Sequence, residues 1–600
     1  MISFENYTAN PFLRMRRKTI AVMAGNIQIG GDAPIVVQSM TTTPTRDINA
    51  TVKQCITLAE AQCQMIRITA PGVNDAKALK EIRSQFSAAG FEKIPLVADI
   101  HFLPRAAMEA IEHVEKVRIN PGNYADKKST AMLEYSDVEY DNELNRIHER
   151  FSPLVIRAKE LGRCLRIGVN HGSLSDRVLN RYGDTPEGMV VSAMEFIRIA
   201  EDNGFNQMIV SMKSSNPKVM VSAYRLLTIE LNKHGVNYPL HLGVTEAGDG
   251  DDGRVKGASG IGSLLADGMG DTIRVSLTEE PEAEIPVCFD LLNTFPYTKV
   301  NDSIEAAATP SYSQHHTNSN PFFIENNPSL PVTKKEPLVF YSQDPKAGYK
   351  LGDAQLLSKD ETVAEDPSLR LIIMSDDNTN VSMIHNHCVL FDMSKLNEQK
   401  IQTLLSKLPS DNYIGISNAG EYEWIQAYRK LATIDQQSVT TNMPNRPICL
   451  ALVDHDNLVE IASICGSLFI DGIGSAIYTP KLKNFPNRCL AILQAVKMRI
   501  TKTDYVSCPS CGRTLFDLMD VTQTIRSATD HLKGLTIAIM GCIVNGPGEM
   551  ADADFGYVGT GPGLVTLYKG YEPVIKNIPN SEACERLIDL IKSEGLWVNP

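Results

Sequence analysis

The feature that most constrains this chain is a regular alternation of short apolar runs and amphipathic stretches between residues 20 and 285. The eight apolar runs are residues 35–40, 64–69, 95–99, 116–120, 165–169, 207–213, 240–244 and 272–276. Segments with helical periodicity lie between them, for example 51–62, 105–114 and 217–234. Strands that alternate with helices form parallel sheets, and eight such units in this length predict a (β/α)8 barrel within an α/β protein.

The carboxyl ends of the eight runs carry the candidate chemistry, because barrel active sites lie at that end. Asp99 and Glu246 are the only obvious acids there, so pairing with them would leave a surplus of buried positive charge, which is costly. Arginine forks match phosphate oxygens bidentately, so we expect a small substrate with one or two phosphates. The five cations come from five different runs and are Arg67, Arg118, Arg166, Lys213 and Arg274.

Uncharged and weakly basic side chains at the same end complete the candidate binding set. They are His101, Asn120, Asn170 and Ser276. Glu246, in the segment Gly-Val-Thr-Glu-Ala-Gly, is the candidate catalytic acid or base. Nearby cations would lower its pKa and burial would raise it, and the sequence leaves that balance open.

A second candidate site is formed by three of the 12 cysteines. Cys508 and Cys511 form a Cys-x-x-Cys pair, which suits a zinc half-site, a redox pair or part of a cluster. Cys542 follows without a second such pair, which disfavours a zinc ribbon and suits an iron–sulfur cluster with one non-cysteine position. Glu549 can supply that position; Cys584 competes for it but lies in an ordinary helical pattern.

The pattern predicts three folded units. Residues 1–297 form the barrel, 298–336 a linker rich in Ser, Thr, Asn and Pro, and 496–600 a smaller α+β unit with the cysteines. Residues 337–495 form an inserted α/β domain, an irregular or incomplete barrel with a structural role. Its six expected strands are 338–343, 369–375, 389–393, 413–417, 448–453 and 468–473.

Eight motifs together resemble those of the 4-hydroxy-3-methylbut-2-enyl diphosphate synthase family, in its large, three-domain form. The resemblance covers residues 35–276 and 507–560. The motifs are VQSMTTT, VADIHF, VRINPGN, RIGVNHGSL, LGVTEAG, DTIRVSLT, SCPSCGR and GCIVNGPGE.

The resemblance implies a substrate, a reaction and a cofactor. The family opens 2-C-methyl-D-erythritol 2,4-cyclodiphosphate by a two-electron reductive dehydration in isoprenoid precursor biosynthesis. It implies that the five cations hold the diphosphate and that Asp99, Asn120, Asn170 and Glu246 surround the carbon skeleton. It also implies a [4Fe–4S] cluster on Cys508, Cys511, Cys542 and Glu549, and ferredoxin or flavodoxin as electron donor.

Composition and charge limit the classes of protein to which this chain can belong. The net charge of −13 gives no sign of general nucleic-acid binding. No apolar run is long enough to span a membrane and no signal segment begins the chain, so we expect a cytoplasmic protein, monomeric or homodimeric. Two other interpretations stay open. One is a metal-independent barrel enzyme, such as a pterin-binding barrel, with a structural zinc domain; the other is a non-enzymatic scaffold.

Overall fold

The computed structural model describes residues 7–8, 10–100, 102–124, 135–296, 337–341, 352–354, 371–374, 388–410, 412–420, 423–438, 446–543, 546–550 and 553–600. His101 and the predicted linker at 298–336 lie outside the described residues, so both stay predictions. In the described part of the chain, no helix combines the length and apolarity needed to cross a membrane.

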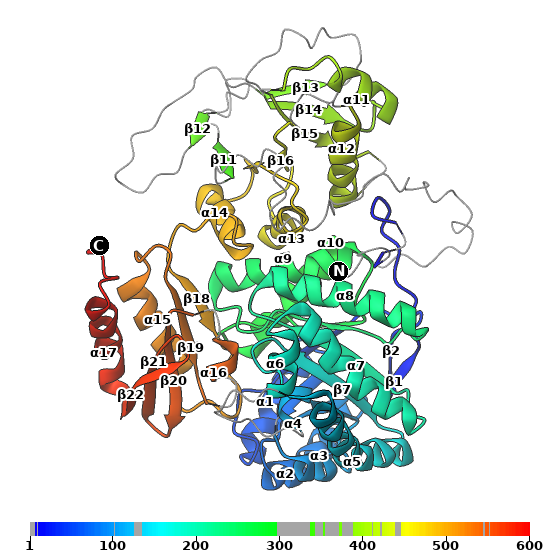
Figure 1. The fold of residues 1–600 in the computed structure, drawn as a ribbon, viewed down its shortest axis with the longest axis vertical. Helices are drawn as coiled ribbons and strands as arrows, with labels where there is room; N and C mark the ends of the chain where they lie inside the picture. Colours follow the sequence, from blue (N-terminus) through cyan, green and yellow to red (C-terminus); the bar gives the residue numbers. More distant parts are fainter. Residues whose placement is uncertain are drawn as a thin grey trace.

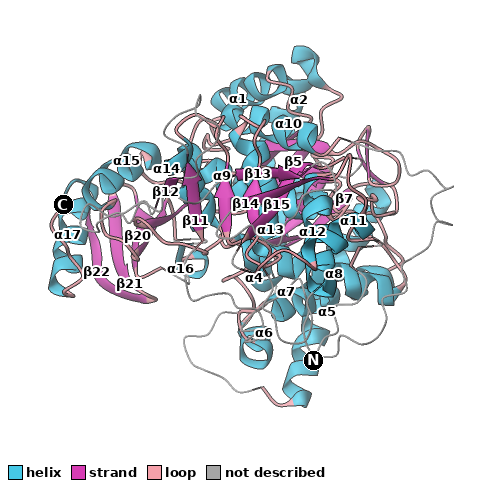
Figure 2. Ribbon diagram, turned by 90° about the horizontal axis from the view of Figure 1, so that it is seen from above, coloured by secondary structure: helices cyan, strands magenta, loops and turns pink. Residues whose placement is uncertain are grey.

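The N-terminal barrel is confirmed, and all eight predicted runs contain a strand. Figures 1 and 2 show its helices packed around the strands. The parallel sheet has the order β8-β7-β6-β5-β4-β3-β10-β9, and a bridge between Val210 and Leu240 joins its two ends. The strands are β3 (Val36–Met40), β4 (Met65–Thr69), β5 (Leu96–Ile100), β6 (Lys116–Ile119), β7 (Cys164–Asn170), β8 (Met208–Lys213), β9 (His241–Leu242) and β10 (Thr272–Ile273).

Helices between and after the strands cover the outside of the barrel. Helix α8 shows how the sequence sets their limits: Asn216 caps its first turn, and Gly235 ends it with a φ of 82°. The helices are α1 (Ile48–Glu60), α2 (Val73–Phe86), α3 (Pro104–Ala110), α4 (Pro121–Tyr124), α5 (Asp137–Leu161), α6 (Asp176–Tyr182), α7 (Pro186–Asp202), α8 (Pro217–His234), α9 (Gly250–Ala266) and α10 (Glu284–Thr294).

The two ends of the barrel differ in polarity. A hairpin of β1 (Val22–Ala24) and β2 (Ile27–Ile29), which the sequence analysis did not predict, packs an apolar cluster on the first inward residues of the strands. Further along the strands the inward positions are polar. On β6, for example, Lys116 and Arg118 share the inward face because alternate residues of a strand face the same side. The barrel is therefore closed by apolar packing at one end and lined with charge at the other.

The insert contains five of its six predicted strands; the prediction of a strand at 468–473 is wrong. Residues 468–470 are the end of helix α13 (Leu458–Ile470), residues 471–473 lie in the turn after it, and the strand begins at Ala476. Helix α13 is apolar on almost every side and is therefore buried on almost every side. A short apolar run does not distinguish such a buried helix from a strand. The strands are β11 (Leu338–Tyr341), β12 (Gly352–Ala354), β13 (Leu371–Met374), β14 (Cys388–Asp392), β15 (Tyr413–Asn418), β16 (Cys449–Ala451) and β17 (Ala476–Tyr478).

The insert repeats the last part of the barrel. In both units a helix, α9 or α13, leads into a strand that lies between two parallel neighbours, β10 between β3 and β9, or β17 between β11 and β16. The two helical segments also share sequence at a constant separation of 204 positions. The matching pairs are Ala-Ser at 258–259 and 462–463, Gly-Ser-Leu at 262–264 and 466–468, and Asp-Gly at 267–268 and 471–472.

The repeated helices pack on each other reciprocally. A Cβ on Gly262 would lie 2.7 Å from Cβ of Ser463, and one on Gly466 would lie 2.5 Å from Cβ of Ser259. Each contact has its counterpart with the two units exchanged, as in an interface between symmetric subunits. A buried charge cluster continues the same pattern. Its ion pairs, 2.7–2.9 Å long, join Arg225 and Arg429 each to both Asp267 and Asp471.

The remaining insert helices are α11 (Glu398–Leu405), α12 (Trp424–Ser438) and α14 (Phe485–Ala495). The C-terminal unit is α+β, as predicted, with a five-stranded sheet in the order β18-β19-β20-β21-β22. Its strands are β18 (Asp504–Ser507), β19 (Thr536–Met540), β20 (Phe555–Gly561), β21 (Leu564–Lys569) and β22 (Glu572–Pro579). Helices α15 (Leu518–Thr529) and α17 (Asn580–Ser593) pack with the sheet, and α16 (Gly546–Glu549) is a short turn of helix.

Candidate active site

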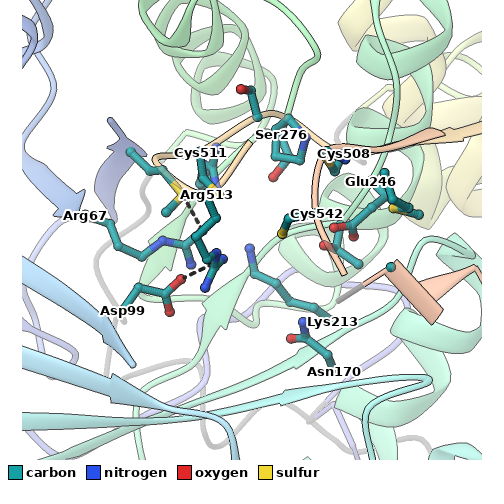
Figure 3. A pocket seen from close by; sticks show the side chains of 18 of the residues that line it. Arg67, Asp99, Asn170, Lys213, Glu246, Ser276, Cys508, Cys511, Arg513 and Cys542 are labelled. Carbon is teal, nitrogen blue, oxygen red and sulfur yellow. Dashed lines mark hydrogen bonds and ion pairs between the residues drawn. The ribbon is translucent and has the colours of Figure 1, made fainter. Parts of the chain in front are cut away.

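The strand ends of two units of the same chain face each other across one cavity. Cys508 follows β18 and Cys542 follows β19, and both face the carboxyl ends of the barrel strands (Figure 3). A backbone bridge between Ala247 and Ser507 joins the two units directly. The cavity has a volume of about 60 Å³. The predicted site residues that line it are Arg67, Asp99, Arg118, Asn170, Lys213, Glu246, Arg274, Ser276, Cys508, Cys511 and Cys542.

Ion pairs hold the C-terminal unit on its own barrel. Asp252, in the first turn of α9, pairs with Lys502 at 2.7 Å and with Arg526 at 2.5 Å. On the same helix, Lys256 pairs with Asp504 at 2.8 Å. Several ion pairs, buried to different degrees, bridge this one interface. Together they fix the orientation of the C-terminal unit relative to the barrel.

The cations of the barrel are paired more extensively than the sequence indicated. Arg118 pairs with Asp99 at 2.9 Å. Arg274 pairs with Glu284 of α10 at 2.8 Å, so the expectation that only Asp99 and Glu246 were available as acids is wrong. Glu284 was missed because it follows the last barrel strand within a helix. Among the described residues, Arg67, Arg166 and Lys213 have no carboxylate partner, so the predicted surplus is three cations.

The three surplus cations are strongly desolvated. Arg166 is 1% exposed, and its Nε and Nη1 have no hydrogen-bond partner. Burial and the charge of Arg67 lower the pKa of Lys213 well below its usual range. Gly243 makes room for this lysine, since a Cβ there would lie 2.7 Å from its Nζ. An anion in the cavity would satisfy charges that the protein leaves without partners.

Two carboxyl groups meet beside these cations. Glu246 has a φ of 47°, a strained conformation for this residue, and its buried Oε2 has no hydrogen-bond partner. Glu549 accepts hydrogen bonds from Asn170 and, at 3.3 Å, from Thr245. Burial and the nearby charge of Glu246 raise the pKa of Glu549 well above its usual range. The two carboxyl groups therefore lie close enough for the charge of Glu246 to oppose ionisation of Glu549.

The three cysteines fit a cluster better than a single metal ion. Among the described residues, no three His, Cys, Asp or Glu side chains converge on one point as zinc ligands do. An iron–sulfur cluster instead holds its thiolates on separate irons, and Cys508, Cys511 and Cys542 line one cavity without converging. The backbone N–H of Gly541 donates to Sγ of Cys508 at 3.4 Å. Burial raises the pKa of the Cys508 thiol, so binding a cluster there would release a proton.

Comparison with known proteins decides the family. Residues 19–289 match the GcpE TIM-barrel domain, and residues 504–593 match the GcpE protein C-terminal domain. The 4-hydroxy-3-methylbut-2-en-1-yl diphosphate synthase (flavodoxin) of Leptospira interrogans is 44% identical over 99% of each chain. The protein of the same name from Akkermansia muciniphila is 45% identical over 99% of each chain. The one from Parabacteroides distasonis is 43% identical over 97% of this chain and 99% of its own. The chain belongs to the 4-hydroxy-3-methylbut-2-en-1-yl diphosphate synthase family.

The two family matches flank the insert, whereas these synthase relatives align along nearly the whole chain. The insert is therefore shared with those relatives. A solved dihydropteroate synthase from Xanthomonas albilineans aligns with 48% of this chain and 99% of its own, at 14% identity and a TM-score of 0.29.

Not every predicted site residue lines the cavity. Arg166 lies four residues before Asn170 on β7, deeper in the barrel. Asn120 is fully buried, and both polar atoms of its side chain are unpartnered. Glu549 lies beside the lining at Asn170. Arg513 also lines the cavity and was not predicted, although a cation directly after Cys-Pro-Ser-Cys-Gly is a usable signal.

Proposed function

We propose that this chain converts 2-C-methyl-D-erythritol 2,4-cyclodiphosphate to (E)-4-hydroxy-3-methylbut-2-enyl diphosphate and water. The reaction consumes two electrons and two protons, opens the cyclic diphosphate and removes one oxygen from the carbon skeleton. The observation that carries the proposal is the cavity in which cations without carboxylate partners face three cysteines. A diphosphate would neutralise the cations, and the cysteines would bind a redox cofactor.

The barrel residues would bind the substrate and manage its charge. Arg67, Arg118, Arg166, Lys213 and Arg274 would hold the diphosphate while negative charge develops on it as the ring opens. Asp99, Asn120, Asn170 and Ser276 would orient the carbon skeleton and the phosphate oxygens. Glu246, whose Oε2 has no partner of its own, would donate the proton to the departing oxygen.

The cofactor that fits is an iron–sulfur cluster, and we propose the [4Fe–4S] type. Cys508, Cys511 and Cys542 would hold three of its irons, and Glu549 is the proposed ligand of the fourth. When bound, the cluster supplies the two electrons one at a time. The relatives' names specify flavodoxin, so we propose a flavodoxin or ferredoxin as the donor for this chain.

We propose a barrel at 1–297, a linker at 298–336, a structural insert at 337–495 and a cluster domain at 496–600.

Anaerobic turnover of the cyclic diphosphate with a chemical reductant tests this function. The anaerobically purified chain should be brown and should form the linear diphosphate. Glu246→Gln should lower turnover by about a hundredfold or more, because a positioned acid contributes that much, while substrate binding and cluster absorbance persist. Glu280→Gln, an exposed change outside the cavity, is the matched control and should keep full activity. A colourless zinc protein, or full activity in Glu246→Gln, would contradict the proposal.

A further inference from the structure

Glu284 is a buried carboxylate that does not line the cavity but contacts a cation that does. It is the first residue of α10 and is 1% exposed. Its Oε2 accepts a hydrogen bond from Nε of Arg274 at 3.0 Å, and its Oε1 accepts one from Nη2 of the same arginine at 2.8 Å. Two parallel hydrogen bonds of this kind fix the plane of a guanidinium group as well as balancing its charge. Glu284 therefore determines which edge of Arg274 is left for a ligand.

The carboxylate of Glu284 is itself held in place by two other parts of the barrel. Oγ of Ser39, on β3, donates to Oε2 at 2.6 Å, and the backbone N–H of Leu277 donates to Oε1 at 3.3 Å. Each carboxylate oxygen thus accepts two hydrogen bonds, so the group is fixed in one orientation. The orientation of Arg274 is therefore imposed by its surroundings before any ligand is bound.

The edge of Arg274 that Glu284 leaves free converges with a second arginine of the cavity. Nη1 of Arg274 donates to Sδ of Met40 at 3.3 Å, and Nη2 of Arg67 donates to the same sulfur at 3.0 Å. All three side chains line the cavity. A thioether sulfur is a weak acceptor, whereas phosphate oxygens bind guanidinium N–H groups strongly. Two guanidinium nitrogens that approach one weak acceptor are in position to bind a single phosphate group.

We propose that Glu284 is a positioning residue for the diphosphate: it turns Arg274 so that Nη1 of this arginine and Nη2 of Arg67 bind the same phosphate group. This inference rests on the proposed function, because it concerns the phosphates of the same substrate. A carboxylate beside a phosphate-binding arginine also reduces the positive charge that attracts the substrate. Positioning and simple neutralisation therefore predict opposite changes in affinity when Glu284 loses its charge.

The test compares Glu284→Asp and Glu284→Gln with the unchanged, anaerobically purified holoenzyme. The shorter carboxylate keeps the charge but loses the reach, and the amide keeps the reach but replaces one acceptor with a donor. Calorimetry without reductant should show that both changes weaken binding of the cyclic diphosphate about tenfold, and KM should rise by a similar factor. Asp290→Asn, which removes a carboxylate elsewhere on α10, is the matched control and should keep the wild-type affinity and KM.

Combining Arg67→Gln with Glu284→Asp tests whether the two arginines share one phosphate. Each single change should weaken binding. The double variant should lose less affinity than the product of the two single losses, because groups that act on one phosphate are coupled. A loss equal to that product would show that the two arginines act independently and would overturn the inference.

Cluster absorbance and a melting curve establish the folded, cluster-loaded fraction of each variant. If the Glu284 variants do not fold, Ser39→Ala decides: it keeps both charges, removes one hydrogen bond from Glu284 and should weaken binding about two- to fivefold. Unchanged or tighter binding in the folded variants overturns the inference, and so does a fall in kcat at unchanged KM, which would assign Glu284 to folding. If the wild-type chain does not bind the cyclic diphosphate, the proposed function itself fails and the inference falls with it.

Discussion

At the scale of single residues, the barrel interior carries a lysine that no described carboxylate neutralises. Lys116 is 0% exposed, and its Nζ donates to Oε1 of Gln38 at 3.3 Å. Burial lowers the pKa of Lys116 to about 7, and the charge of Arg166 adds to this effect. The residue lies beneath the substrate cations, so the protein carries this cost whether or not substrate is bound.

Lys116→Met should remove a pH-dependent penalty on folding. The folded pKa lies below the unfolded value of 10.5, so the penalty is complete below about pH 7 and disappears as pH rises toward 10.5. Its upper bound is on the order of 5 kcal/mol. Denaturant unfolding of the wild-type chain and the variant from pH 6 to 10 checks this. The variant should be more stable at pH 6, and the difference should shrink as pH rises. A constant difference would contradict it.

At the scale of elements, the contact of α9 with α13 depends on small residues. Glycine on one helix faces serine on the other at both crossing points, which brings the backbones close together. The contact joins the barrel to the insert, and the insert in turn leads into the C-terminal unit. A change at this contact should therefore alter how the C-terminal unit, with its three cysteines, is held relative to the barrel.

Gly466→Ala should destabilise the chain by about 1–3 kcal/mol, because the added Cβ would lie 2.5 Å from Cβ of Ser259. The matched control is Gly257→Ala on α9. Its Cβ would find its nearest neighbour, Cγ1 of Val275, at 3.5 Å, so the change should stabilise the helix by about 0.5–1 kcal/mol. Thermal unfolding distinguishes them, since the two melting temperatures should move in opposite directions. Equal shifts would show that the helices can separate without cost.

At the scale of the whole molecule, the cysteine unit covers the barrel of its own chain. The site has two halves, the cations of the barrel and the cysteines of the C-terminal unit. Contacts within the chain, among them Lys256 to Asp504 and Thr278 to Cys508, bring these two half-sites together. The sequence alone does not decide whether they meet within one chain or across a dimer.

A mixture of two inactive chains should therefore stay inactive. Glu246→Gln lacks the proposed acid of the barrel and Cys508→Ser lacks a cluster ligand, so each chain has only one working half-site. Co-expression and co-purification should give no more turnover than either variant alone, because complete sites form only within a chain. Co-expression of either variant with the wild-type chain controls for yield. Recovery of activity in the mixed sample would show that half-sites pair between chains.

Local patterns in the sequence determined much of this molecule. The eight barrel strands follow from short apolar runs between helices, and the cation-rich end follows because alternate strand residues share a face. Cys508, Cys511 and Cys542 were identified by spacing and residue type. These features depend on residues that are close together in the chain, so they can be recognised without knowledge of the fold.

Only the tertiary structure decided which distant groups meet. Residues 468–470 belong to helix α13, which is buried on nearly all sides, and a short apolar run does not distinguish a buried helix from a strand. Glu284 neutralises Arg274, and Arg513 enters the barrel from the other end of the chain. Pairing and docking depend on distances between residues far apart in sequence. Residue types and local periodicity therefore predicted the chemistry, and packing decided which charges remain for the substrate.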